Sequence, residues 1–336
     1  MSIKKVADLA GVSIATVSRF FNNPEQVRKE TRQKVEKAIA KTNYAPNSLA
    51  QNFRRGKTGL VIVVIPRVGD AFYDGIVSSL SQTARENGYN ILVKEAQFNT
   101  LTLEHYQGMI SSKQADGIVL FVGLSAGARK TLKPSSKYPP IVLACEPPTY
   151  KNHHRLPSVR IDNVAAAKEA TNYLISLGHK NIAYISGDKK STSATERESG
   201  YKAAMRSARL SSKATILEGG SSLSSAKEAT HKLLDLPTRP TAIFCGNDEM
   251  AIGVLHEIKA SKLKVPEDIS IIGFDNIRYA EMTDPPLTTI SQPAEDIGAR
   301  TMELLCKAID GHNMSNTIEL LSHHLIVRKS TSSPHN

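Results

Sequence analysis

From Leu60 onward, short apolar runs alternate with segments of helical periodicity, and this alternation constrains the fold more than any other feature of the chain. The apolar runs are Leu60–Ile65, Ile91–Val93, Gly117–Val122, Ala183–Ser186, Ala242–Cys245 and Ile269–Phe274. Between them, apolar residues recur at helical spacing, as in Ile76–Arg85. Apolar strands separated by amphipathic helices indicate parallel sheets covered on both faces. About 270 residues of this pattern predict two α/β lobes rather than one.

The segment that precedes these strands carries most of the positive charge. The formal net charge of the chain is +11. Residues 1–58 contain about 12 lysines and arginines against about 4 acidic residues, so about +8 lies there and about +3 in the remainder. A nearly neutral body with a basic head is the charge distribution of a nucleic-acid binder. Because apolar residues recur in this head at helical spacing, we expect it to fold rather than to form a solvated tail.

The head has the pattern of a helix-turn-helix unit. Apolar residues line one face of a first predicted helix, at Ile3, Val6, Ala7, Leu9 and Ala10. Gly11 supplies the turn, and Ser13 can cap a second helix over residues 14–21. A third helix is predicted over residues 30–41, after the break at Asn22–Pro24. An all-α head of this kind reads DNA, although a plain helical hairpin would share the pattern.

The second helix of such a unit enters the major groove with its N-terminus first. The predicted DNA-binding residues of this helix are therefore Ser13, Ile14, Ala15, Thr16, Ser18 and Arg19. Ile14 can pack on a thymine methyl group, whereas polar or charged side chains can meet base edges or phosphates.

Several motifs in both regions resemble those of the LacI/GalR repressor family. In the head these are GVS-x-x-TVSR, TR-x-KV and Y-x-PN, all within Val6–Ile65. In the body they are VRIDN (159–163), LGHKNIAYISG (177–187), RPTAIFCGNDEMAIGVL (239–255), VPEDISIIGFDN (265–276) and DPPLTTISQP (284–293). The resemblance runs nearly to the end of the chain. It implies a helix-turn-helix head (1–46), a hinge (47–58) and a two-lobed effector-binding and dimerisation domain (59–336), related to periplasmic sugar-binding proteins.

The resemblance also implies that the hinge becomes helical on DNA and enters the minor groove. The matching positions here are Asn47, Ala50, Phe53 and Arg54. Phe53 stands where the family commonly carries a leucine that wedges between base pairs. Phenylalanine can act as such a wedge, but it could equally be a partly exposed linker aromatic.

Residues that follow strands are the candidates for the effector cleft, because open α/β sheets bind ligands at the carboxyl ends of their strands. These candidates are Phe72, Tyr73, Phe244, Asn247 and Asp275, and the family resemblance adds Arg197. Phe244 could instead belong to the core. An acidic and a basic group with aromatic rings suit a neutral polyol or a base.

Within the family, the resemblance favours a nucleoside effector such as cytidine, with a purine base or a sugar as the alternative. It also implies a homodimer on a double-stranded operator and cooperation with the cyclic-AMP receptor protein. Inducer and corepressor relationships both occur in the family, and the favoured branch points to induction.

Other function classes find little support. The sequence has no G-x-S-x-G or H-E-x-x-H motif, and we expect no enzyme activity, no cofactor and no metal site. A binding protein without a regulatory role would share the body, but the start of the chain lacks the apolar stretch of a secretory signal. Three widely spaced cysteines indicate reduced thiols. The expectation is a cytoplasmic protein.

Overall fold

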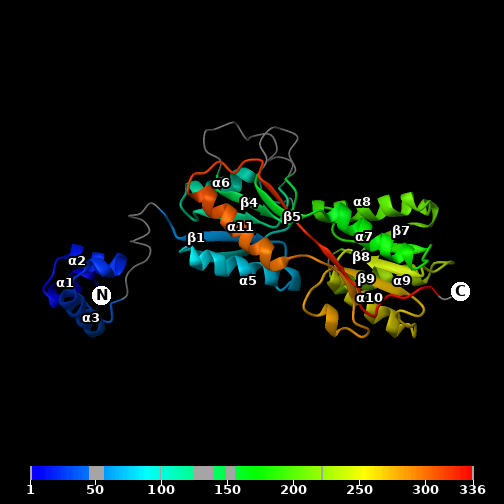
Figure 1. Ribbon diagram of the computed structural model, residues 1–336, viewed down its shortest axis with the longest axis horizontal. Coiled ribbons are helices and arrows are strands. Elements are labelled where there is room, and N and C mark those ends of the chain that lie inside the picture. The colour runs from blue at the N-terminus through cyan, green and yellow to red at the C-terminus, as the bar shows by residue number, and fades with distance from the viewer. Residues whose placement is uncertain are drawn as a thin grey trace. The chain divides into compact units, whose positions relative to one another are not determined.

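A computed structural model describes residues 2–44, 57–98, 100, 102–124, 139–148, 156–220 and 222–334. The chain divides into two compact units, Met1–Thr58 and Gly59–Asn336. Figure 1 shows a helical first unit and an α/β second unit, and each is described here by itself.

The first unit contains the helices α1 (Ile3–Ala10), α2 (Ile14–Asn22) and α3 (Lys29–Thr42). Gly11 ends α1 in the left-handed conformation, with φ of 64°. Ser13 caps α2, because its hydroxyl accepts a hydrogen bond from the Thr16 backbone amide at 3.1 Å. The predicted helix-turn-helix arrangement is thus present, with helix ends within one residue of those expected.

The core of this unit consists of small and branched side chains from all three helices: Val6, Ala7, Ala10, Val17, Val35 and Ala38. Leu9, predicted to face inward with them, is instead 53% exposed. The prediction for Leu9 was wrong because a helix this short buries only a narrow stripe, and Leu9 lies beside it.

The second unit contains two lobes, each built on a sheet of six strands within the described part of the chain. The first lobe has the strand order β11-β5-β4-β3-β1-β2, and all of its pairs are parallel. Its strands are β1 (Leu60–Ile65), β2 (Asn90–Glu95), β3 (Gly117–Leu120), β4 (Ile141–Ala144), β5 (Ser158–Ile161) and β11 (Ile318–Leu321). Helices α5 (Ala71–Glu86) and α11 (Ala294–Ile309) cover one face, and α6 (Leu103–Ser111) packs on the other.

The second lobe has the strand order β12-β10-β9-β8-β6-β7, and only β12 runs antiparallel among these six strands. The strands are β6 (Ile182–Ser186), β7 (Thr215–Glu218), β8 (Ala242–Cys245), β9 (Ser270–Asp275), β10 (Thr288–Ser291) and β12 (His324–Ile326). Helices α7 (Asn163–Ser176) and α8 (Thr192–Ser207) pack on one face, and α9 (Leu223–Leu234) and α10 (Asp248–Ala260) on the other. The predicted class, parallel sheets in two lobes, is therefore confirmed.

The chain passes between the lobes after β5, after β10 and after β11 (Figure 1). Each sheet is therefore completed by segments distant in sequence. Strands β1, β4, β6, β8 and β9 are almost entirely buried, as expected for strands covered on both faces. Their carboxyl ends supply the residues of the site.

Candidate functional site

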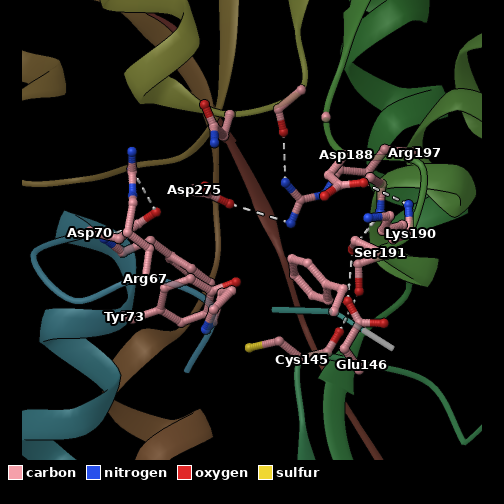
Figure 2. A pocket seen from close by; sticks show the side chains of 18 of the residues that line it. Arg67, Asp70, Tyr73, Cys145, Glu146, Asp188, Lys190, Ser191, Arg197 and Asp275 are labelled. Atoms are coloured by element: carbon pink, nitrogen blue, oxygen red, sulfur yellow. Dashed lines mark hydrogen bonds and ion pairs between the residues drawn. The ribbon is translucent and has the colours of Figure 1, made fainter. Parts of the chain in front are cut away.

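A cavity of about 440 Å³ lies where strand ends of both sheets meet (Figure 2). The first lobe contributes residues that follow β1, β2 and β4: Pro66, Arg67, Asp70, Phe72, Tyr73, Gln97, Phe98, Cys145 and Glu146. The second lobe contributes residues that follow β6, β7 and β8 or end β9: Gly187, Asp188, Lys190, Ser191, Ser193, Ala194, Arg197, Ser222, Gly246, Asn247 and Asp275. Both lobes thus enclose the same space, as expected for a ligand cleft in an α/β protein.

Arg197 and Asp275 form an ion pair on the wall of this cavity. Arg197 Nη2 lies 3.4 Å from Asp275 Oδ1, and both side chains are largely buried. The guanidinium also donates to the Gly246 carbonyl oxygen at 2.6 Å and lies 3.8 Å from the centre of the Phe274 ring. These contacts hold the two charged groups in fixed positions, where they can offer a donor and an acceptor to a ligand.

The backbone at Asp275 is unusual. Its φ is 110° and that of Asn276 is 53°, a region that non-glycine residues rarely adopt. Gln292 Nε2 donates to Asp275 Oδ1 at 2.7 Å, and the buried carboxylate of Asp248 accepts from the Ile277 amide at 2.9 Å. Burial raises the pKa of Asp275, and the Arg197 charge partly offsets that rise. Burial also raises the pKa of Asp248, with a further contribution from the negative charge of Asp275.

Aromatic side chains form the opposite wall. Asp70 caps α5 by accepting from the Phe72 amide at 3.0 Å, which fixes the start of the helix that carries Phe72 and Tyr73. Tyr73 packs edge-on against Phe121 with ring centres 5.4 Å apart. Figure 2 shows Tyr73 across the cavity from Arg197. A planar ligand between these walls would meet an aromatic surface on one side and charged groups on the other.

Polar contacts join the two lobes at the edges of the cavity. Glu146 accepts from Ser191 Oγ at 2.7 Å and from the Thr192 amide at 3.1 Å, across the cleft. Burial raises the pKa of Glu146 to about 6, opposed by the hydrogen bond from Ser191. On the other side, Arg67 pairs with Glu249 on α10. These contacts depend on the lobes being close together.

Five of the six predicted effector residues, namely Phe72, Tyr73, Arg197, Asn247 and Asp275, line the cavity. Phe244 does not, and its assignment to the cleft is corrected. It is fully buried on β8, where its ring packs against Tyr184 and Phe274 with centres 5.0 and 6.5 Å away. Successive side chains of a strand point to opposite faces of the sheet. Phe244 points to the face that α7 and α8 cover and not into the cavity at the strand ends.

The sequence interpretation missed Glu146, Asp188, Lys190 and Ser191, which also line the cavity. Asp188 follows β6, a predicted strand, so its position at a strand end was a usable signal. Glu146 follows β4, a short strand that was not predicted, and could be found only after that strand was recognised. Lys190 and Ser191 sit in the turn that the Asp188 side chain stabilises by accepting from the Lys190 amide at 2.8 Å.

In the first unit, the predicted DNA-contacting residues surround the start of α2. Ile14 is 44% exposed, and Ala15 and Arg19 are also exposed. Val17 on the opposite face is fully buried. Ser13 and Thr16 share a hydrogen bond of 2.9 Å between hydroxyls, and Ser18 is half-buried. The remaining predictions, Asn47, Ala50, Phe53 and Arg54, lie outside the described residues.

A helix-turn-helix unit followed by a two-lobed α/β unit with a polar and aromatic cleft defines the class of DNA-binding regulators that sense a small molecule. Residues 2–47 match the model of the bacterial regulatory proteins, lacI family, and residues 171–331 match the periplasmic binding protein-like domain. The chain is 37% identical over 331 residues to the HTH-type transcriptional repressor CytR of Escherichia coli (strain K12), covering 98% of this chain and 96% of the relative. The chain belongs to the lacI family of bacterial regulatory proteins.

Other similar proteins agree with this assignment. Catabolite control protein A of Priestia megaterium is 37% identical over 334 residues, covering 98% of this chain and 99% of that protein. The lac repressor dimer, in a crystal structure with operator and the anti-inducer ONPF, superposes with a TM-score of 0.85 at 26% identity over 99% of both chains. The chain is therefore a DNA-binding transcriptional repressor with an effector-binding domain. Among the described residues, no helix is long and apolar enough to cross a membrane.

Proposed function

We propose that this repressor binds its operator as a homodimer in the cytoplasm and that a nucleoside such as cytidine, bound in the cleft, changes its operator affinity. The observation that carries the proposal is the cavity itself, with the Arg197–Asp275 pair on one wall and Phe72 and Tyr73 on the other. A nucleoside combines both complementary features. Its ribose hydroxyls suit the charged pair, and its base suits the aromatic wall.

The charges of the lining favour a ligand without phosphate. The described lining contains four carboxylates and three cations, namely Asp70, Glu146, Asp188 and Asp275 against Arg67, Lys190 and Arg197. Arg67 already pairs with two carboxylates, Asp70 and Glu249, and Arg197 pairs with Asp275. Because acidic groups outnumber basic ones and both arginines are already paired, a nucleoside or a sugar suits the cavity better than a nucleotide.

A sugar is the second candidate, since hydroxyl groups alone could satisfy the Arg197–Asp275 pair. One similar structure is the complex of the transcriptional regulator CelR with cellobiose, with a TM-score of 0.68 at 28% identity over 98% of this chain. The aromatic wall is compatible with sugar rings as well as with bases. The choice between the two classes therefore depends on a binding measurement.

DNA recognition in this proposal uses the exposed start of α2. Ile14 and Ala15 face base edges, Ser13, Thr16 and Ser18 meet polar groups, and Arg19 reaches phosphates. Asn47, Ala50, Phe53 and Arg54 contact the minor groove. A two-fold symmetric pair of such heads reads a near-palindromic operator. The proposal includes cooperation with the cyclic-AMP receptor protein, and operator fragments with and without that protein added would test it.

The experiment is calorimetric titration of the full-length protein with cytidine, adenosine, hypoxanthine, ribose, cellobiose and cytidine monophosphate. We expect heat of binding with cytidine and much weaker binding of its monophosphate. Operator affinity is then measured by fluorescence anisotropy with and without saturating cytidine. A lower operator affinity with cytidine supports induction. Binding of cellobiose or ribose alone would replace the nucleoside with a sugar, and unchanged operator affinity would contradict effector control by cytidine.

A further inference from the structure

A series of polar contacts leads from the cavity to the first lobe through side chains that do not line the cavity. Arg197 donates from Nε to Asn163 Oδ1 at 2.9 Å, and Asn163 donates from Nδ2 to Glu196 Oε2 at 3.3 Å. Glu196 also accepts from Arg160 Nη1, at 2.9 and 3.1 Å to its two oxygens. At the cavity end of the series stands Asp275, paired with Arg197.

The series spans both lobes. Arg160 belongs to β5 of the first lobe, whereas Glu196 and Arg197 are consecutive residues of α8 in the second lobe. Asn163 is the first residue of α7, directly after the chain has crossed from β5 into the second lobe. The Arg160–Glu196 ion pair therefore joins the lobes at this crossover, and its side chains are only 17% and 22% exposed. A change in lobe angle at the crossover would alter this pair.

The contacts at Asn163 require a side chain that both accepts and donates. A guanidinium can only donate and an ionised carboxylate can only accept, so a residue between them must do both. Asn163 does so with a side chain that is 1% exposed. Aspartate would retain the acceptor for Arg197 but would place a second carboxylate against Glu196. Alanine would leave both neighbours without this partner in a buried position, which is costly.

We propose that Asn163 is a positioning residue that orients Arg197 in the effector cavity and links it to the lobe-spanning Arg160–Glu196 ion pair. The effector class in this inference rests on the proposed function, but the linkage does not depend on which ligand fills the cavity. A ligand that engages Arg197 in one lobe arrangement favours that arrangement through this linkage.

The linkage is tested first without ligand, by NMR of the full-length protein. The Nε–Hε correlation of Arg197, assigned by its loss in Arg197→Lys, reports the hydrogen bond to Asn163. We expect this resonance to shift in Asn163→Ala, Asn163→Asp and Glu196→Gln. The matched control is Glu198→Gln, because Glu198 lies on the same helix but pairs with Lys202 of that helix. An unchanged resonance in Asn163→Ala, or an equal shift in Glu198→Gln, would overturn the proposal.

A second set of measurements separates the orientation of Arg197 from its linkage to the lobes. Cytidine affinity reports the first, and the effect of cytidine on operator affinity reports the second. Glu196→Gln leaves Asn163 and Arg197 in place and removes the charge that pairs with Arg160. Cytidine affinity should therefore stay within about threefold of the wild type, while the effect of cytidine on operator affinity falls about fivefold or more. Asn163→Ala should bind cytidine about tenfold more weakly or worse. If Asn163→Ala does not fold, Asn163→Asp and Glu196→Gln carry the test. An undiminished effect of cytidine on operator affinity in Glu196→Gln would overturn the linkage.

A wild-type protein that ignores cytidine would contradict the proposed effector instead. In that case the Arg197 resonance alone tests the positioning role of Asn163. The proposed effector and the proposed role of Asn163 can therefore fail separately.

Discussion

Asp275 is the cavity residue in which burial, backbone conformation and charge coincide. It ends β9 with φ of 110°, is 7% exposed and touches both Arg197 and Gln292. A buried carboxylate in a rare backbone conformation costs free energy, and such costs concentrate at functional sites. This residue therefore offers the most direct test of the site.

Replacement of Asp275 by asparagine should weaken cytidine binding roughly 10- to 100-fold, because one acceptor oxygen becomes a donor and the ion pair with Arg197 is lost while the shape is kept. Calorimetric titration measures the effect. Asp284→Asn, at an aspartate whose side chain is 94% exposed, is the control and should bind as the wild type does. Equal affinities of Asp275→Asn and the wild type would remove Asp275 from the effector site.

The raised pKa of Asp275 also predicts how stability changes with pH. Burial raises this pKa from the ordinary value of 3.8 to about 7. Between these values the folded state holds the proton more tightly than the unfolded state, so the free energy of unfolding should fall as pH rises from about 4 to about 7.

Urea unfolding of the ligand-free protein at several pH values tests this sign. In Asp275→Asn the decline should be shallower, by up to about 1.4 kcal/mol per pH unit. Some decline should remain, because burial raises the pKa of Asp248 and of Glu146 as well. If the free energy of unfolding fell more steeply with pH in Asp275→Asn than in Asp284→Asn, the predicted contribution of Asp275 would have the wrong sign.

At the scale of elements, the contact between α7 and α8 depends on one glycine. A Cβ atom at Gly200 would collide with the Val164 carbonyl oxygen and would come within 2.9 Å of Ala167 Cβ. The two helices can therefore approach closely only without a side chain at this position. This close approach brings Asn163 on α7 next to Glu196 and Arg197 on α8.

We expect Gly200→Ala to destabilise the protein by about 1–3 kcal/mol, because backbone atoms must move apart to admit the methyl group. Gly108→Ala is the matched control. Gly108 also lies within a helix, but nothing lies within 4 Å of the added Cβ. That change should stabilise the protein by about 0.5–1 kcal/mol, since alanine favours the helix. Thermal or urea unfolding distinguishes the two, and similar effects would contradict the close-packing argument.

At the scale of the whole molecule, the uneven charge distribution determines how DNA binding responds to salt. About +8 of the net charge of +11 lies in residues 1–58. Binding that neutralises phosphates releases counterions, so operator affinity should fall linearly on a log–log plot against salt concentration.

If Arg19 contacts a phosphate, Arg19→Gln should reduce the slope of log affinity against log salt concentration by about 1, because one fewer counterion is released. Lys232→Gln, which removes an exposed charge from α9 in the second unit, should leave the slope unchanged. Fluorescence anisotropy with operator DNA at several salt concentrations provides the slopes. The same slope for Arg19→Gln and for the wild type would place Arg19 away from the phosphates.

Local patterns in the sequence determined the helices of the head, six of the described strands and the class of protein. The runs at Leu60–Ile65 and Ala242–Cys245 became strands β1 and β8 with the predicted ends, and Ser13 caps α2 as expected. Such features depend on neighbouring residues: burial on both faces requires a continuous apolar run, and a cap requires a side-chain acceptor two or three residues before an amide. The family motifs then identified the regulator and its cleft.

Tertiary structure decided which side chains meet. Phe244 was assigned to the cleft from its position near a strand end, yet the pleat turns it into the core. Glu146 and Ser191 are 45 residues apart and face each other only because the chain crosses between lobes. The connection of Arg160 to Arg197 through Asn163 likewise requires two helices packed at Gly200. Contacts of this kind depend on long-range packing, which the local pattern of a sequence does not encode.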